Sequence, residues 1–193
     1  MKKTLLILLV LFASKTFSQT VSYGLSAGIN YSNLSGDGNP ATSSYLTGIR
    51  AGGLVDIGFK SFSIQPGLLF SKMGGQNTPK TEQLILNYLQ IPVNFLYREK
   101  ENAGSFFIGG GPYISFGTLA TDIYDNLRDN FYFGNNEGLD RADVGLSALT
   151  GYQFSSGFAI SGSYSLGLTD VYSTGADNKN KAFNISIDYF FKL

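Results

Sequence analysis

The sequence contains no cysteine, no histidine and no tryptophan among its 193 residues. A chain without cysteine can form neither a disulfide framework nor a thiolate metal site. The common nucleophile and base pairs of hydrolytic enzymes need histidine or cysteine, so we expect no enzymatic activity and no metal or cofactor. No apolar run reaches the roughly 20 residues that a membrane-spanning helix requires. If the chain spans a membrane, it must do so as strands.

Charge of one sign is not in excess, because 14 basic residues balance 14 acidic ones. The N-terminus has the layout of a secretory signal, with Lys2 and Lys3, an apolar stretch over residues 4–13, and small residues before the expected cleavage site. We expect residues 1–18 to be removed, which leaves one domain over residues 19–193; a signal anchor is the alternative. The mature chain is then slightly acidic, and no nucleic-acid partner is indicated.

The first segment after the signal alternates strictly. Apolar side chains occupy its odd positions from Val21 to Tyr31, and serine, glycine or asparagine occupies its even positions from Ser22 to Ser32. Successive residues of a strand point to opposite faces, so one face of this strand is apolar and the other carries only small polar groups.

Seven further segments show similar alternation: residues 48–59, 62–71, 84–97, 105–117, 141–154, 158–171 and 181–193. The fifth strand, residues 105–117, is the least regular, because both faces contain aromatic residues and three glycines interrupt it. The connections alternate between long and short along the chain. Long extracellular loops and short periplasmic turns are typical of outer-membrane barrels.

A soluble, lipocalin-like barrel is the alternative, with its large side chains inside. Its surface would then be the face of glycine, serine, asparagine and glutamine, whereas soluble surfaces are commonly rich in lysine and glutamate. Small residues suit the narrow interior of an eight-stranded barrel better. The sequence therefore predicts an all-β fold, an eight-stranded antiparallel transmembrane β-barrel of the up-and-down type.

Aromatic residues recur near the end of each strand that we assign to the periplasm. A girdle of such rings at the membrane–water boundary is typical of these barrels, although aromatics are also common in strands generally. The predicted girdle consists of Tyr23, Phe59, Phe62, Tyr97, Phe107, Phe154, Phe158 and Phe191.

Six charged residues are predicted to face the lumen: Arg50, Asp56, Arg141, Asp143, Asp188 and Lys192. An unpaired charge in a narrow bore is costly, so each needs a partner or water. We expect either an ion-pair network centred on Arg50 and Asp143, which would close the bore, or separate hydration of each charge. These residues are structural or pore-lining candidates and not catalytic ones.

Several short motifs indicate a family. They are residues 24–28 (Gly-Leu-Ser-Ala-Gly), 87–92 (Asn-Tyr-Leu-Gln-Ile-Pro), 109–113 (Gly-Gly-Gly-Pro-Tyr), 143–146 (Asp-Val-Gly-Leu) and 164–170 (Tyr-Ser-Leu-Gly-Leu-Thr-Asp). With them the mature chain resembles the outer-membrane β-barrel domain of the porin or PorT-like kind that is abundant in Bacteroidota. The resemblance implies the cell outer membrane as location. Such barrels usually end in an aromatic that assists recognition by the assembly machinery, whereas this chain ends in Lys192 and Leu193.

The function expected from these features is a structural or interaction role. The partners expected are outer-membrane lipid, the assembly machinery, and a surface or secretion-system protein. A narrow channel for water or small solutes is the alternative. The predicted loop over residues 118–140 carries the acidic residues Asp122, Asp125, Asp129, Glu137 and Asp140, which either bind a cation such as Ca²⁺ or form a solvated acidic loop.

Overall fold

The structure is a computed structural model that describes residues 20–36, 44–77, 80–101, 103–125, 127–134, 138–172 and 178–191. The expected signal segment lies outside these residues. Within the described part of the chain there are nine strands and no helix long and apolar enough to cross a membrane. The strands are β1 (Thr20–Ser35), β2 (Ser44–Gly58), β3 (Phe62–Gln76), β4 (Glu82–Glu101), β5 (Gly104–Tyr124), β6 (Leu127–Phe131), β7 (Ala142–Phe154), β8 (Phe158–Gly167) and β9 (Lys179–Phe191).

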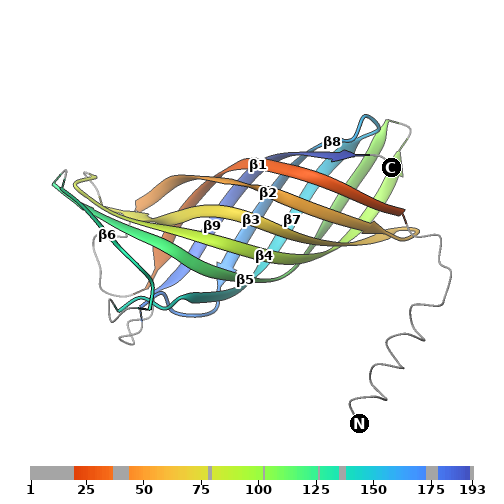
Figure 1. Cartoon of the computed structure of the whole chain (residues 1–193). Helices are drawn as coiled ribbons and strands as arrows, with labels where there is room; N and C mark the ends of the chain where they lie inside the picture. Colours follow the sequence, from red (N-terminus) through yellow and green to blue (C-terminus); the bar gives the residue numbers. More distant parts are fainter. Residues whose placement is uncertain are drawn as a thin grey trace, which may run out of the picture.

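Eight of these strands close into an antiparallel barrel (Figure 1). Each of them pairs with its neighbours in the order β1, β2, β3, β4, β5, β7, β8, β9, and β9 pairs back onto β1. Within the described ranges the ninth strand, β6, pairs only with β5. The eight-stranded, all-β antiparallel barrel predicted from the sequence is confirmed.

The stagger of the strands sets the width of the barrel. A row of paired residues that leaves β4 at Gln90 crosses all the other barrel strands and returns to β4 at Lys100, ten residues further along. A row that closes with such a shift requires strands tilted against the barrel axis, as Figure 1 shows. An eight-stranded barrel of this kind has an interior just wide enough for side chains.

The two ends of the barrel differ in their connections. Turns of only two or three residues join β2 to β3, β4 to β5 and β7 to β8, at the end where β1 starts and β9 finishes. We call this the terminal end; it lies on the right in Figure 1. Longer connections lie at the opposite end, which we call the loop end. There β3, β4 and β5 extend beyond the limits expected from the sequence, to Gln76, from Glu82 and to Tyr124.

Two expectations about strand limits are wrong. β8 ends at Gly167 and not at residue 171, and Val171 instead turns inward at the loop end, where it is buried. Residues 127–131, predicted to be loop, form β6 because the upper part of β5 extends past β7 and offers them a partner: β7 pairs with β5 no further than Phe116. Both differences concern the loop end.

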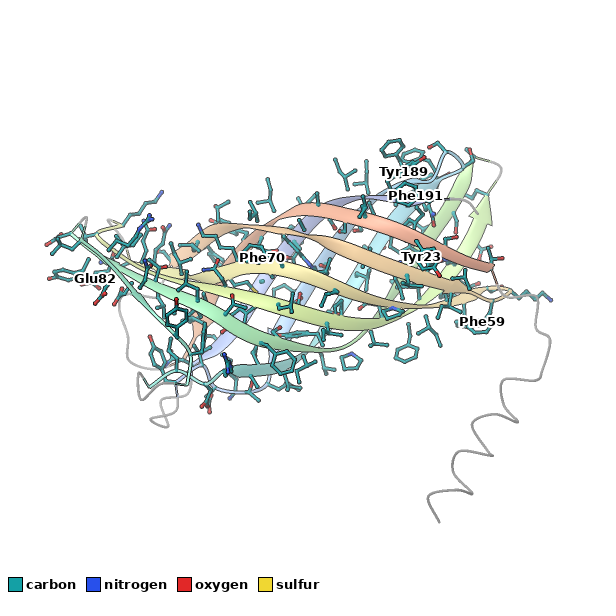
Figure 2. The ribbon with its side chains drawn as sticks, viewed as in Figure 1. Tyr23, Phe59, Phe70, Glu82, Tyr189 and Phe191 are labelled. Carbon is teal, nitrogen blue, oxygen red and sulfur yellow. The ribbon has the colours of Figure 1, made fainter. Side chains whose placement is uncertain are left out.

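The outer and inner walls follow the predicted alternation. Ile29, Ile49, Ile185 and Ile187 are each more than half exposed on the outer wall, and many other large apolar side chains share it (Figure 2). The inner wall carries small and polar residues, among them Ser26, Asn30 and Asn184, which are buried. Large apolar residues dominate the outer wall and small or polar residues are frequent on the inner wall, which is the reverse of a soluble barrel.

Candidate functional site

The lumen has apolar clusters near both ends and polar groups between them. At the loop end, Leu34, Met73, Leu86 and Ala182 belong to one buried cluster. At the terminal end, Leu54, Leu96, Phe107 and Phe190 belong to a second. Glycines on the wall make room for the larger rings: a Cβ at Gly117 would lie 2.5 Å from the ring of Phe133, and one at Gly145 would overlap the ring of Tyr113. The bore is therefore filled mainly by side chains.

The strongest charged contact in the lumen joins β4 to β2 near the terminal end. The Arg98 guanidinium donates from Nη2 to Asp56 Oδ1 at 3.0 Å, and both side chains are nearly buried. Arg98 also donates from Nε to Ser63 Oγ at 2.9 Å and from Nη1 to Gln153 Oε1 at 2.8 Å. Its guanidinium carbon lies 5.2 Å from the centre of the Phe107 ring, a distance suited to a cation–π contact. One arginine on β4 thus contacts four other strands, β2, β3, β5 and β7.

Asp143 is held by neutral groups. Its carboxylate accepts hydrogen bonds from Thr169 Oγ1 at 3.2 Å, Asn180 Nδ2 at 3.2 Å and Tyr113 Oη at 3.4 Å. Among the described residues the ion pairs are Arg98 with Asp56 and Lys179 with Asp170. The direct pair of Arg50 with Asp143, at the centre of the ion-pair alternative, is therefore not formed. The polar neighbours of Asp143 take the place of that arginine.

Arg50 and Asp188 line a small cavity in the middle of the lumen. Its volume is roughly 30 Å³, enough for one or two water molecules. Asp188 accepts a hydrogen bond from Ser161 at 3.2 Å, and its charge acts on Arg50. Arg50 Nε and Asp188 Oδ1 have no hydrogen-bond partner among the described residues. This cavity is the polar centre of the bore.

Two of the predicted lumen charges, Arg141 and Lys192, are not among these contacts. Arg141 is exposed and precedes the first residue of β7, so it does not face the bore as predicted. Lys192 lies outside the described residues. Arg98, in contrast, was not among the expected lumen charges, although its place on the polar face of its strand could have revealed it.

The mouth of the barrel at the loop end contains a ring from a connecting segment. Phe133 follows β6 and is only 3% exposed. Its ring lies 5.5 Å from that of Tyr88 on β4 and against Gly117 on β5. Leu139 from the same segment pairs with Tyr172 from the β8–β9 connection, and Leu139 and Val171 join the apolar cluster at this end. Described residues from two connections therefore fold inward at the mouth.

Most of the predicted girdle residues are on the outer wall at the terminal end. Figure 2 shows Tyr23, Phe59 and Phe191 there, together with Tyr189, which was not predicted. Neighbouring rings are in contact: the ring centres of Phe62 and Tyr97 are 5.4 Å apart, and those of Phe158 and Tyr189 are 4.7 Å apart. Phe154 is also exposed.

The expectation for Phe107 is wrong. Phe107 is 4% exposed and points into the lumen, while its neighbour Phe106 is 45% exposed and takes the outward place. The pairing of β5 with β4 and β7 fixes which of two adjacent rings faces out, and that register is not visible in the sequence.

Of the acidic residues of the long connection, the structure brings together only Asp122 and Asp129 among those it describes, on paired strands. Asp122 lies on β5 and Asp129 on β6, Asp125 lies in the turn between them, and Asp140 precedes β7. No group of three or more potential metal ligands occurs among the residues that the structure describes. Glu137 lies outside them.

Comparison with known proteins decides the family. The sequence model of the outer membrane protein beta-barrel domain matches residues 13–173, most of the chain. The chain belongs to this family. It is an integral outer-membrane β-barrel protein, so the outer wall faces lipid. In such barrels the short turns are periplasmic and the long loops extracellular.

Solved structures show the same fold at low sequence identity. Neisserial surface protein A (NspA) superposes with a TM-score of 0.55 at 11% identity, over 89% of this chain and 99% of that one. The attachment invasion locus protein Ail of Yersinia pestis, solved in complex with the heparin analogue sucrose octasulfate, superposes with a TM-score of 0.51 at 15% identity. The match covers 89% of this chain and 99% of that one. No curated protein matches the chain in sequence.

Proposed function

We propose that the barrel is closed to solutes and acts through its extracellular end. Its role would be structural support of the membrane, or contact with a surface or secretion partner. The observation that carries the proposal is the position of Phe133, which is buried in the mouth of the barrel between Tyr88 and Gly117. A conducting barrel needs a continuous polar path, and an apolar cluster at each end of the lumen works against one.

A narrow pore for water or small solutes is the second candidate. It is favoured by the small cavity beside Arg50 and Asp188 and by the polar residues around it.

The charges at the loop end indicate which kind of partner could bind there. The Ail structure contains a sulfated saccharide analogue. The loop end of this chain exposes Lys80, Arg128 and Arg141 among Asp122, Asp125, Asp129 and Asp140, so its described residues offer no basic surface that would attract a polyanion. We therefore favour a protein partner.

Conductance separates the two candidates. The mature chain, refolded and inserted into a planar lipid bilayer, is expected to show no steady conductance. The Phe133→Ala variant should remain closed as well, because the second apolar cluster lies near the other end of the bore. Steady conductance of the wild type would contradict the closed-lumen proposal and support the pore.

The absence of cysteine allows a sharp test of orientation. Tyr132→Cys places a thiol on an exposed position of the loop end, and Ser156→Cys is the matched exposed position in a turn of the terminal end. A membrane-impermeant maleimide added to intact cells should label the first and not the second. Labelling of Ser156→Cys alone would place the loops in the periplasm and refute contact with an external partner.

The remaining details of the proposal follow from the sequence. Residues 1–18 would be a cleaved signal, and N-terminal sequencing of the mature protein should begin at Gln19. The chain would be inserted by the outer-membrane assembly machinery, would belong to the porin or PorT-like kind, and would have no enzymatic activity.

A further inference from the structure

Strand β6 has one edge with which no described strand pairs, and we call it the free edge. The lower part of β5 pairs with β7 from Gly104 to Phe116, and its upper part pairs with β6 from Ala120 to Tyr124. Every strand of the barrel wall has a neighbour on both sides, whereas among the residues that the structure describes β6 pairs only with β5. In Figure 1, β5 and β6 project from the loop end of the barrel. A row of unpaired backbone groups on such an edge is a template for another strand.

The turn before β6 determines which backbone groups are free. Tyr124 pairs with Leu127, so two residues form the turn, and Asp125 has the positive φ of 46° that such turns require. The pair that flanks a two-residue turn is hydrogen-bonded, and the pairs then alternate along the ladder. Arg128 and Asn130 therefore direct their amide and carbonyl groups away from β5, toward the free edge.

The side chains around this edge indicate the chemistry of a partner. Leu127 is 74% exposed and Tyr124 opposite it 58% exposed, although both lie outside the lipid-facing wall. Asp129 lies directly opposite Asp122, and like charges in that position destabilise a strand pair. Neither carboxylate has an ion-pair partner among the residues that the structure describes. A basic side chain opposite Asp129 would neutralise this pair.

We propose that β6 is a docking edge for an extended polypeptide segment that carries a lysine or arginine opposite Asp129 and an apolar residue opposite Leu127. The segment adds a strand to the sheet, so backbone hydrogen bonds supply affinity and the alternate side chains supply selectivity. Asp129 faces the added strand at a non-hydrogen-bonded position, where opposed side chains come closest. This inference rests on the proposed role in extracellular contact and names the kind of partner.

The test uses a peptide probe with the mature protein in lipid nanodiscs. The probe is a fluorescein-labelled peptide of sequence Thr-Val-Thr-Lys-Thr-Val-Thr, which is symmetric and can pair in either direction. A second peptide replaces its lysine by glutamate. Fluorescence anisotropy should show binding of the lysine peptide at least tenfold tighter than that of the glutamate peptide. Asp129→Asn should reduce that preference to less than threefold.

A pair of variants at one position separates backbone from side chain. Arg128→Pro removes the free-edge N–H and is tolerated on an edge strand, whereas Arg128→Ala removes the side chain and keeps the N–H. We expect Arg128→Pro to weaken lysine-peptide binding at least tenfold and Arg128→Ala to leave it within about twofold. Heat-modifiable gel migration verifies that the barrel itself is folded in each variant.

Hydrogen exchange of the wild type tests the site without a mutation. The peptide should slow exchange of the Arg128 and Asn130 amides and leave that of Ile108, in the barrel wall, unchanged. The proposal is overturned if the wild type does not bind the lysine peptide, if binding leaves those amides unprotected, or if both Arg128 variants bind equally. It is also overturned if β6 associates with β6 of a second copy and the peptide cannot compete. A closed, correctly oriented barrel with any of these results would still satisfy the proposed function.

Discussion

The outer and inner walls of the barrel are built from alternate residues of the same strands, yet they follow opposite rules. On β9, Ile185 is 55% exposed, and its neighbours Asn184 and Ser186 are buried. The outer wall needs no specific partner, because any apolar side chain satisfies lipid. The inner wall depends on particular partners, such as the contacts of Arg98. The loss of stability caused by a substitution on the outer wall should therefore depend on the polarity of the new side chain. On the inner wall it should depend on which neighbours lose a contact.

The largest effect should come from the inner wall. Arg98→Met leaves the nearly buried Asp56 without its cation, and loss of one member of a buried ion pair costs about 3–5 kcal/mol. Lys179→Met is the control, because its pair with Asp170 is 3.7 Å long and partly exposed, and such pairs contribute at most about 1 kcal/mol. Urea unfolding in lipid vesicles, followed by circular dichroism, measures both. Equal losses would mean that the lumen is as well hydrated as the surface.

A charge on the outer wall should be nearly as costly. Ile185 lies between the aromatic end of β9 at Phe191 and Lys181 toward the loop end, and it faces lipid. Ile185→Arg should lower the free energy of unfolding by about 2–4 kcal/mol, the loss expected for arginine near the bilayer midplane. Ile185→Leu is the matched control and should be close to neutral. If the two variants were equally stable in vesicles, the outer wall would not be in hydrocarbon.

Removing the ring in the mouth should have an intermediate effect. Phe133→Ala exposes the apolar cluster at the loop end. It should lower the free energy of unfolding by about 1.5–3 kcal/mol, the contribution of one buried phenylalanine side chain. The connecting segment should then exchange its amides faster, whereas the barrel strands should keep their protection. Hydrogen exchange by mass spectrometry resolves the two regions. Faster exchange throughout the barrel would show that Phe133 stabilises the wall as well as the mouth.

The smallest effect concerns a contact on the outer wall. Tyr31 and Tyr45 stack with ring centres 4.6 Å apart and planes 6° from parallel. Their coupling should amount to about 0.5–1.5 kcal/mol. A double-mutant cycle of Tyr31→Ala and Tyr45→Ala measures this coupling directly. A coupling near zero would mean that the two tyrosines contribute through lipid contact alone.

The residues of the outer wall could be predicted from the alternation of the sequence, because the alternation shows which side chains share a face. Pairing between strands was not predictable in the same way. Residues 127–131 (Leu-Arg-Asp-Asn-Phe) lack alternation, and they form a strand because the extended part of β5 lies beside them. Phe106 and Phe107 are adjacent rings on a strand with mixed faces, so the sequence could not say which one enters the lumen.

The contacts inside the lumen were the hardest to anticipate. Asp143 is held by groups from the β8–β9 region and from β5, and the sequence gives no measure of their distance. Arg98 shares the polar face with Gln90 and Asn94, so its direction was visible, but its partner Asp56 is 42 residues away. The local sequence pattern thus shows which way a side chain points. Its hydrogen-bond or ion-pair partner is determined only when the barrel closes.

The first and last strands are joined to each other from Tyr23 with Phe191 to Ser35 with Lys179. A chain that still lacks β9, residues 179–191, would leave two unpaired strand edges, one on β1 and one on β8. The barrel can therefore close only after β9 has been synthesised and exported. Until β9 is in place, a periplasmic factor is needed to keep the unpaired edges of β1 and β8 from pairing with other chains.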